Sequence, residues 1–199
     1  GRPAVGLSVK GEGPITDYSA QLSLSTNGQE RLAGTLTLGT PDQTGENATT
    51  PAQRFALDIG GDIAPLFAPG YRDFFGRNVS LRVAGERGAD GAMVLEQLSL
   101  SAKALNLQGE AAIAADGWPE RLALNGRIGG QDGARVLLPL SGPRTSLREA
   151  QIDLSFDAAE GDSWGLDIRA NEFARPDLSL SEATVSATGS LQRAVDGRP

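Results

Sequence analysis

Paired carboxylates are the residues of this chain that could support acid–base chemistry. Glu160 and Asp162 form one such pair, and Asp177 and Glu182 form another. Two carboxylates that flank a reacting group can act as general acid and general base. Both pairs lie in sequences typical of turns, where carboxylates are normally solvated. The sequence therefore favours ordinary surface carboxylates over a catalytic pair.

Other catalytic arrangements lack the residue types they require. The chain has no histidine and no cysteine, which removes the Ser-His-Asp triad, thiolate nucleophiles, zinc–thiolate sites and disulfides. The Gly-Glu-Gly-Pro sequence at 11–14 lacks the helix and the lysine of a phosphate-binding loop. No Gly-Gly-x-Gly-x-Asp calcium repeat is found. We therefore expect neither an enzyme activity nor a cofactor or metal.

Charge and composition narrow the classes of partner. The 199 residues include 25 acidic and 18 basic side chains, for a net charge of −7. This balance argues against a nucleic-acid partner and against general adhesion to anionic membranes. Hydrophobic residues make up 39% of the chain but aromatic residues only 5%, so any core is aliphatic. No apolar run approaches the ~18 residues of a membrane span, and no signal peptide is visible at Gly1.

The elements that would position a site are set by a strict alternation of apolar and polar residues. Between Ala104 and Ala114, Leu105, Leu107 and Ile113 share one parity, and polar residues occupy most of the other. Such alternation predicts a β-strand with one apolar and one polar face. Glycine occupies the apolar parity at Gly109, where it would let the strand bend or admit a close neighbour. The same arrangement recurs at Leu32-Gly34-Leu36, Ile59-Gly61-Ile63, Leu124-Gly126-Ile128 and Ala187-Gly189-Leu191.

Turn sequences divide the chain into about thirteen such strands. Asn27-Gly28, Asp116-Gly117 and Asp132-Gly133 are typical of tight connections between antiparallel strands. The sequence therefore predicts an all-β fold, a long antiparallel meander that curls toward its apolar side, in a single domain. Residues 41–53 carry almost nothing apolar and are predicted to form an exposed loop. One further strand is expected over Val136, Leu138 and Leu140, with Pro139 marking its edge position or its end.

The apolar parity changes once inside a strand. Met93 and Leu95 stand at odd positions, but Leu98 and Leu100 stand at even positions. A shift of one residue predicts a β-bulge near Glu96 and Gln97. Glu96 is then expected to face away from the apolar interior, because burying an unpaired carboxylate costs several kcal/mol.

Residues 62–76 interrupt the alternation and predict a short helical segment. Asp62 can cap a helix that tolerates Pro65 in its first turn. Four of the ten aromatic residues fall in this segment, and they are Phe67, Tyr71, Phe74 and Phe75. The segment could cover an open end or edge of the sheet, or it could act as a lid over a ligand or a partner contact.

The apolar parity predicts one continuous interior. An interior of this kind could be the closed core of a sandwich or barrel, or an open trough, and periodicity alone does not choose between them. A trough could shield acyl chains from water at about 0.8 kcal/mol per buried methylene. The candidate groove-lining residues are Leu32, Leu36, Leu57, Ile59, Leu81, Val83, Leu98, Leu100, Leu105, Leu107, Ile113, Leu122, Leu124, Ile128, Leu138, Ile152, Leu154 and Phe156. Leu22, Leu24, Leu166, Ile168 and Val185 extend the same interior.

Five segments of the chain carry a resemblance to a known family. They are Gly-Asp-Ile-Ala-Pro-Leu at 61–66, Tyr-Arg-Asp-Phe-Phe-Gly at 71–76, Asp-Gly-Trp-Pro-Glu-Arg at 116–121, Leu-Pro-Leu-Ser-Gly-Pro at 138–143 and Gly-Asp-Ser-Trp at 161–164. These segments resemble the alphaproteobacterial TamB family of the AsmA-like superfamily. The resemblance covers roughly residues 5–191. Its motifs reflect the general pattern of the sequence, and they are not catalytic motifs.

The resemblance implies a location and a function. In that family a signal anchor holds the protein in the inner membrane, and a long periplasmic β-structure, folded like a taco shell, reaches the outer membrane. The family is implicated in moving phospholipids between the membranes and in outer-membrane protein assembly with the barrel protein TamA. Residues 1–199 would be one β-rich periplasmic segment of such a protein, without its anchor or its partner-binding region.

Two functions of different classes therefore stay open. The segment could conduct lipid along an apolar groove, with phospholipid as its ligand. It could instead be a scaffold or chaperone that guides unfolded β-strands along its open edge, with a TamA-like barrel as partner through regions absent here. A carbohydrate-binding sandwich is a weaker third interpretation, because few aromatic residues are free to stack on sugars.

Overall fold

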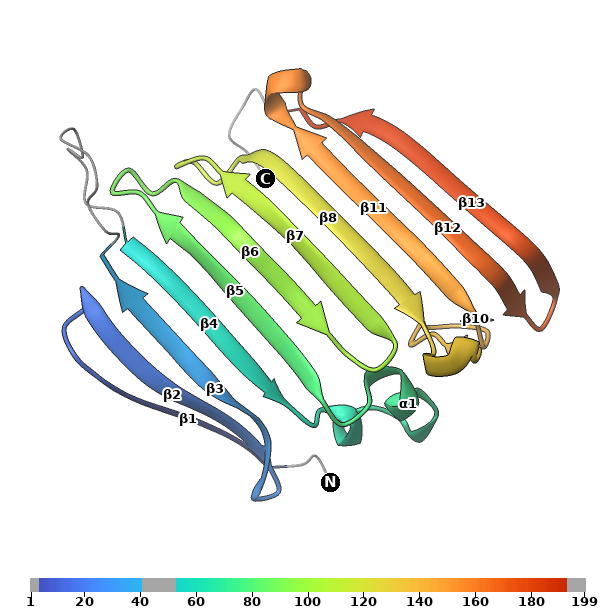
Figure 1. Ribbon diagram of the computed structural model, residues 1–199, viewed down its shortest axis with the longest axis horizontal. Coiled ribbons are helices and arrows are strands. Elements are labelled where there is room, and N and C mark those ends of the chain that lie inside the picture. Colours follow the sequence, from blue (N-terminus) through green and yellow to red (C-terminus); the bar gives the residue numbers. More distant parts are fainter. Residues whose placement is uncertain (1–3, 41–52, 193–199) are drawn as a thin grey trace.

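The computed structural model describes residues 4–40 and 53–192 of the chain, and it confirms an all-β fold. The strands of this part form one antiparallel sheet that is not closed (Figure 1). The strands are β1 (Val5–Glu12), β2 (Asp17–Thr26), β3 (Gln29–Gly39), β4 (Gln53–Gly61), β5 (Val79–Arg87), β6 (Met93–Ser101), β7 (Leu105–Ile113), β8 (Pro119–Gly129), β9 (Val136–Leu137), β10 (Ser146–Leu147), β11 (Glu149–Asp157), β12 (Ser163–Arg175) and β13 (Leu178–Ser190). The short helices are η1 (Ala64–Leu66), η2 (Pro69–Tyr71), α1 (Arg72–Phe75), η3 (Gln131–Gly133) and η4 (Ala158–Glu160).

The order of the strands in the sheet follows the order of the chain almost throughout. β1 to β8 are neighbours in sequence, and β11, β12 and β13 continue the sheet beyond β8. The small strands β9 and β10 pair with each other, and Ser146 of β10 pairs with Ala174 of β12. β1 and β13 therefore lie at the two edges, and the sheet is a meander, as the sequence predicts.

Turn residues with left-handed backbone conformations explain the tight connections. Asn27 and Gly28 have φ angles of 51° and 75°, and they join β2 to β3. Gly117 has a φ of 83° between β7 and β8, and its N–H donates to Ala114 O. Asparagine and glycine are the residues that adopt such angles at low cost. These connections confirm the hairpins predicted at Asn27-Gly28 and Asp116-Gly117. The prediction at Asp132-Gly133 is wrong, because these residues lie in η3 and join β8 to β9, which do not pair with each other.

The bulge predicted near Glu96 is present in β6. Ala84 pairs with Gln97 and Gly85 pairs with Leu95, so Glu96 is passed over on the β5 side. The register also shifts between Leu95 and Leu98 on the β7 side. The extra residue restores Leu95 to the same face as Leu98, and the Glu96 side chain is exposed.

The structure changes the extent of some predicted elements, and one predicted element lies almost entirely outside the described residues. The strand expected to run through Leu140 ends at Leu137, because Pro139 has no N–H to donate to a neighbouring strand. The strand that contains Val185 and Ala187 begins at Leu178, and residues 178–190 form the single strand β13. The loop predicted at 41–53 falls on residues outside the described part, except for Gln53, which opens β4.

The helical segment predicted at 62–76 contains η1, η2 and α1. The carboxylate of Asp62 accepts a hydrogen bond from the N–H of Ala64 at 3.1 Å, although the residue at the N-cap position of η1 is Ile63. Pro65 lies in the first turn of η1, where its missing N–H leaves no helical bond unmade. Gly76 ends α1 with a φ of 67°. The segment lies at one end of the sheet (Figure 1).

This end of the sheet, here called the cap end, holds two clusters of buried apolar residues in the described part of the chain. Phe74 of α1 is buried against Ala104 and Val136, with Leu105 and Ile128 packed against them. The N–H groups of Lys103 and Ala104 donate to the carbonyls of Phe75 and Phe74, both at 3.0 Å. A second cluster at the same end contains Leu147, Ala150 and Ala170. Residues 62–76 and 134–147 are therefore held against the strand ends by packing and by backbone hydrogen bonds.

Candidate functional site

Apolar side chains form continuous rows across one face of the sheet. The register places one residue of each strand except β9 and β10 in each row, and two neighbouring rows contain no polar side chain. The first row is Val9, Leu22, Gly34, Ile59, Leu81, Leu100, Leu107, Gly126, Ile152, Ile168 and Val185. The second row is Gly11, Ala20, Leu36, Leu57, Val83, Leu98, Gly109, Leu124, Leu154, Leu166 and Ala187. We call the surface made by these rows the apolar face.

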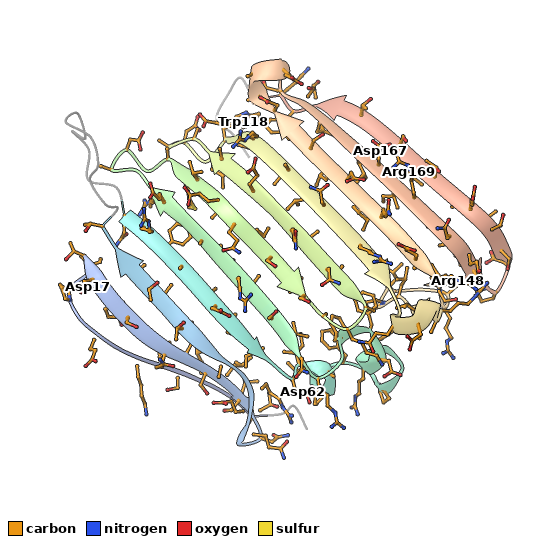
Figure 2. The ribbon with its side chains drawn as sticks, in the orientation of Figure 1. Asp17, Asp62, Trp118, Arg148, Asp167 and Arg169 are labelled. Carbon is orange, nitrogen blue, oxygen red and sulfur yellow. The ribbon has the colours of Figure 1, made fainter. Side chains whose placement is uncertain are left out.

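The row that lies between them on the opposite face is polar along its whole length. Asp167 and Arg169 project from β12 on this polar face (Figure 2), and the Ser186 hydroxyl donates to Asp167 at 2.6 Å. Ion pairs link neighbouring strands there, for example Arg82 with Asp58 at 3.0 Å. The row is Lys10, Gln21, Thr35, Asp58, Arg82, Ser99, Gln108, Asn125, Asp153, Asp167 and Ser186. The sheet is therefore strongly two-faced, as alternation predicts.

The apolar face is only partly buried. Most of the residues predicted to line the interior retain part of their surface, Phe156 is buried with 4% exposed, and Val185 is 54% exposed. In the described part of the chain no large side chain is fully buried. The strands form one layer, so side chains are covered by their neighbours within the sheet and not by a facing layer (Figure 1). The described residues therefore form the open arrangement and not a closed core.

The structure brings the predicted groove-lining residues together on this face. Leu32 pairs with Gly61 beside the first row, and Leu105 pairs with Ile128 at the cap end. Leu122 pairs with Phe156 in a third row nearer the opposite end. Leu138 stands apart, because it follows β9 and packs against the buried clusters of the cap end.

Trp164, Leu38 and Phe55 belong to the third row but were not among the residues predicted to line the interior. Trp164 pairs with the predicted residue Phe156 and with Gly189, and Leu38 pairs with Phe55. All of these positions have the parity of the apolar face, so the alternation that identified Leu122 also identifies them. Trp164 is the largest addition, and its indole ring lies over Gly189, where a Cβ would be 2.7 Å from Nε1.

Glycines on the apolar face accommodate close neighbours, as predicted. A Cβ at Gly34 would overlap the carbonyl oxygen of Asp58, and a Cβ at Gly109 would overlap that of Ala123. Both overlaps are with the backbone of an adjacent strand, which cannot move aside as a flexible side chain can. A Cβ at Gly126 would instead lie 3.2 Å from the side chain of Leu107. Glycine therefore permits the local backbone approach that these strands adopt.

The four aromatic residues of the helical segment form part of the cap end. Phe67 and Phe75 stack with ring centroids 3.8 Å apart, and Phe74 meets Phe75 edge-on at 5.1 Å. The hydroxyl of Tyr71 donates to Leu140 O at 3.3 Å and so joins the helical segment to the chain after β9. Their packing matches the alternative in which the segment covers one end of the sheet.

The described residues offer neither a metal-binding cluster nor a membrane-spanning helix. No three histidine, cysteine, aspartate or glutamate side chains among residues 4–40 and 53–192 are grouped so that they could hold a metal ion. Over the same residues, no helix has both the length and the apolar character needed to cross a membrane.

Comparison with protein-family models, with curated proteins and with solved structures gave no match. The resemblance to the TamB family therefore rests on the sequence segments that carry it.

Proposed function

We propose that the apolar face shields the acyl chains of phospholipids as they pass between the inner and outer membranes. The observation that supports this most directly is the pair of neighbouring rows without a polar side chain, which run from β1 to β13. With strands about 4.8 Å apart, a row that crosses the sheet offers an apolar path of about 50 Å. The chain would act without catalysis, as a periplasmic segment of a longer protein anchored in the inner membrane.

The physical basis is the transfer of hydrocarbon from water to an apolar surface. Each methylene group that loses its contact with water contributes about 0.8 kcal/mol. A partly exposed sheet face stays available for this contact, whereas a closed core would leave no room for a ligand. The shielding is non-directional, so successive positions along a row can hold an acyl chain with similar free energy, which favours movement along the row.

The scaffold function is the second candidate, and the edge strands favour it. β1 and β13 each pair with one strand only within the described residues, and the β1 strand is exposed along its length. Free strand edges can accept another strand through main-chain hydrogen bonds. In this alternative the segment would guide strands of outer-membrane proteins, with a TamA-like barrel as partner through regions outside this chain.

A photo-crosslinking experiment distinguishes the two functions. Leu107 and Gln108 are adjacent in β7 and belong to the apolar row and the polar row. A photo-reactive residue would be placed at each position in the parent protein in cells, and the adducts identified by mass spectrometry. Lipid adducts at Leu107 alone are the expected result. Equal labelling at both positions, or no lipid at Leu107 in a folded protein, would contradict lipid shielding and leave the scaffold.

A further inference from the structure

A hollow on the polar face at the cap end gathers three cationic side chains from separate parts of the chain. Arg77 precedes β5, Lys103 lies in the turn between β6 and β7, and Arg127 belongs to β8. Ser101, Asn106 and Arg127 follow one another in a single cross-strand row of the polar face. The remaining lining residues are Gly76, Asn78, Ala102, Gly129, Gly130 and Gln131, and none of the lining residues is acidic.

The cations in the hollow are available to a ligand. Arg77 forms no ion pair with any described residue. Lys103 pairs with Asp73 at 3.3 Å, and Arg127 pairs with Glu149 at 2.9 Å. Their side chains are 45% and 67% exposed, and exposed ion pairs of this kind contribute only about 0–1 kcal/mol each. A ligand of higher charge can therefore compete for these groups. This concentration of positive charge contrasts with the net charge of −7 of the whole chain.

Neutral hydrogen-bond donors complete the lining. The hydroxyl of Ser101 donates to Asn106 Oδ1 at 2.8 Å, which leaves the amide N–H groups of Asn106 to donate elsewhere. Asn78 and Gln131 add two more side-chain amides. Guanidinium groups match the geometry of a phosphate, and lysine adds a compact charge.

We propose that this hollow binds a phosphate group. Its combination of two guanidinium groups, one ammonium group and amide donors, with no acidic residue, suits a tetrahedral oxyanion. The hollow lies on the face opposite to the apolar rows, so the proposal does not depend on lipid shielding. The phosphate could belong to a small soluble anion or to a lipid headgroup held at the end of the strands, and the two sources share this chemistry.

Arg77 and Arg87 provide a matched pair of variants for the test. Arg77 stands just before β5 at the cap end, and Arg87 is the last residue of the same strand, at the far end. Both side chains belong to exposed residues, and neither forms an ion pair within the described residues. Arg77→Gln and Arg87→Gln therefore change the net charge equally, but only Arg77→Gln alters the hollow.

Titration with inorganic phosphate at low ionic strength, followed by the amide NMR signals of Gly76, Gly129 and Gly130, tests the site. We expect saturable shifts in the wild type, binding weakened at least about tenfold in Arg77→Gln and nearly unchanged binding in Arg87→Gln. Equal weakening in the two variants would show a general charge effect and overturn the proposal. Absence of saturable shifts up to about 10 mM phosphate, a concentration that would still reveal a Kd in the millimolar range, would also overturn it.

A second titration distinguishes the source of the phosphate. A short-chain phosphatidylglycerol, used below its micelle concentration, should produce the same shifts. If it binds more tightly than inorganic phosphate in the wild type and in Leu107→Asp alike, the headgroup source is supported. If it binds no better, the soluble source is supported. If the crosslinking experiment finds no lipid at Leu107 but the hollow still binds phosphate, the result contradicts the shielding function and leaves the phosphate site standing.

Discussion

Leu107 and Gln108 show how one step along a strand changes the chemistry of a site. Leu107 pairs with Leu100 and Gly126 on the apolar face, and Gln108 pairs with Ser99 and Asn125 on the polar face. Leu107→Asp should lower the free energy of unfolding by about 1–3 kcal/mol, because a carboxylate would replace a partly buried leucine. Gln108→Asp, the control, should change it by less than about 0.5 kcal/mol. Urea denaturation measures both values, and equal losses would show that the faces do not differ.

Gly34 should not tolerate a methyl group. The added Cβ would overlap the carbonyl oxygen of Asp58 in β4, so Gly34→Ala should destabilise the protein by about 1–3 kcal/mol. Gly39 lies at the end of the same strand and is the control, because its nearest atom, Thr16 O, is 3.9 Å from a Cβ. Gly39→Ala should be nearly neutral in a urea titration followed by circular dichroism. A neutral Gly34→Ala would mean that β3 and β4 separate at little cost.

At the scale of elements, the bulge in β6 allows the effect of deleting Glu96 to be predicted. Removing Glu96 would leave the pairs that Leu95 and Leu98 make with β7 intact, because Glu96 has no partner of its own there. The shortened strand should fold with a stability within about 1 kcal/mol of the wild type, since a bulge residue contributes little to pairing.

Deletion of Ser99 is the comparison for that experiment. It removes a residue with a regular partner, Gln108. The side chains of β6 on one side of the deletion then point to the opposite face of the sheet. Thermal unfolding followed by circular dichroism measures both deletions, and the Ser99 deletion should be strongly destabilised relative to the Glu96 deletion. Similar melting temperatures for the two deletions would contradict the role assigned to the bulge.

The sequence predicted the elements that depend on local pattern. Alternation identified the strands and the face of each leucine, the parity change located Glu96, and the loss of alternation located the segment at 62–76. The end of β9 depended on how far Pro139 limits pairing, and the sequence left both outcomes open. The hollow around Arg77 was not predicted, because its cations are far apart in sequence and meet only through the register of β6, β7 and β8.

At the scale of the whole molecule, the choice between a closed core and an open face could not be made from the sequence. Both arrangements need the same alternation on every strand. The difference lies in whether a second layer covers the apolar rows, which depends on the curvature accumulated over the whole sheet. The register and the burial of the described residues show the open arrangement.

An open sheet buries less apolar surface than a closed domain of equal length. We therefore expect a heat-capacity change of unfolding below the usual ~12–15 cal/mol/K per residue. Differential scanning calorimetry in detergent-free buffer measures it. Addition of a mild detergent below its micelle concentration should raise the melting temperature, because a ligand that binds only the folded state stabilises it. A heat-capacity change of ordinary size, with no response to detergent, would indicate that the apolar face is covered in solution.

The sequential order of the strands also determines how the sheet unfolds. Each strand from β2 to β7 pairs only with the strands before and after it in the chain, and β1 and β13 do not pair with each other. The free energy of unfolding is then approximately a sum of contributions from neighbouring strand pairs, and distant hairpins open independently of each other. In native-state hydrogen exchange, Gly34→Ala should speed exchange in β2, β3 and β4 and leave the amides of β11 to β13 protected. A uniform increase would instead show that the sheet opens as one cooperative unit.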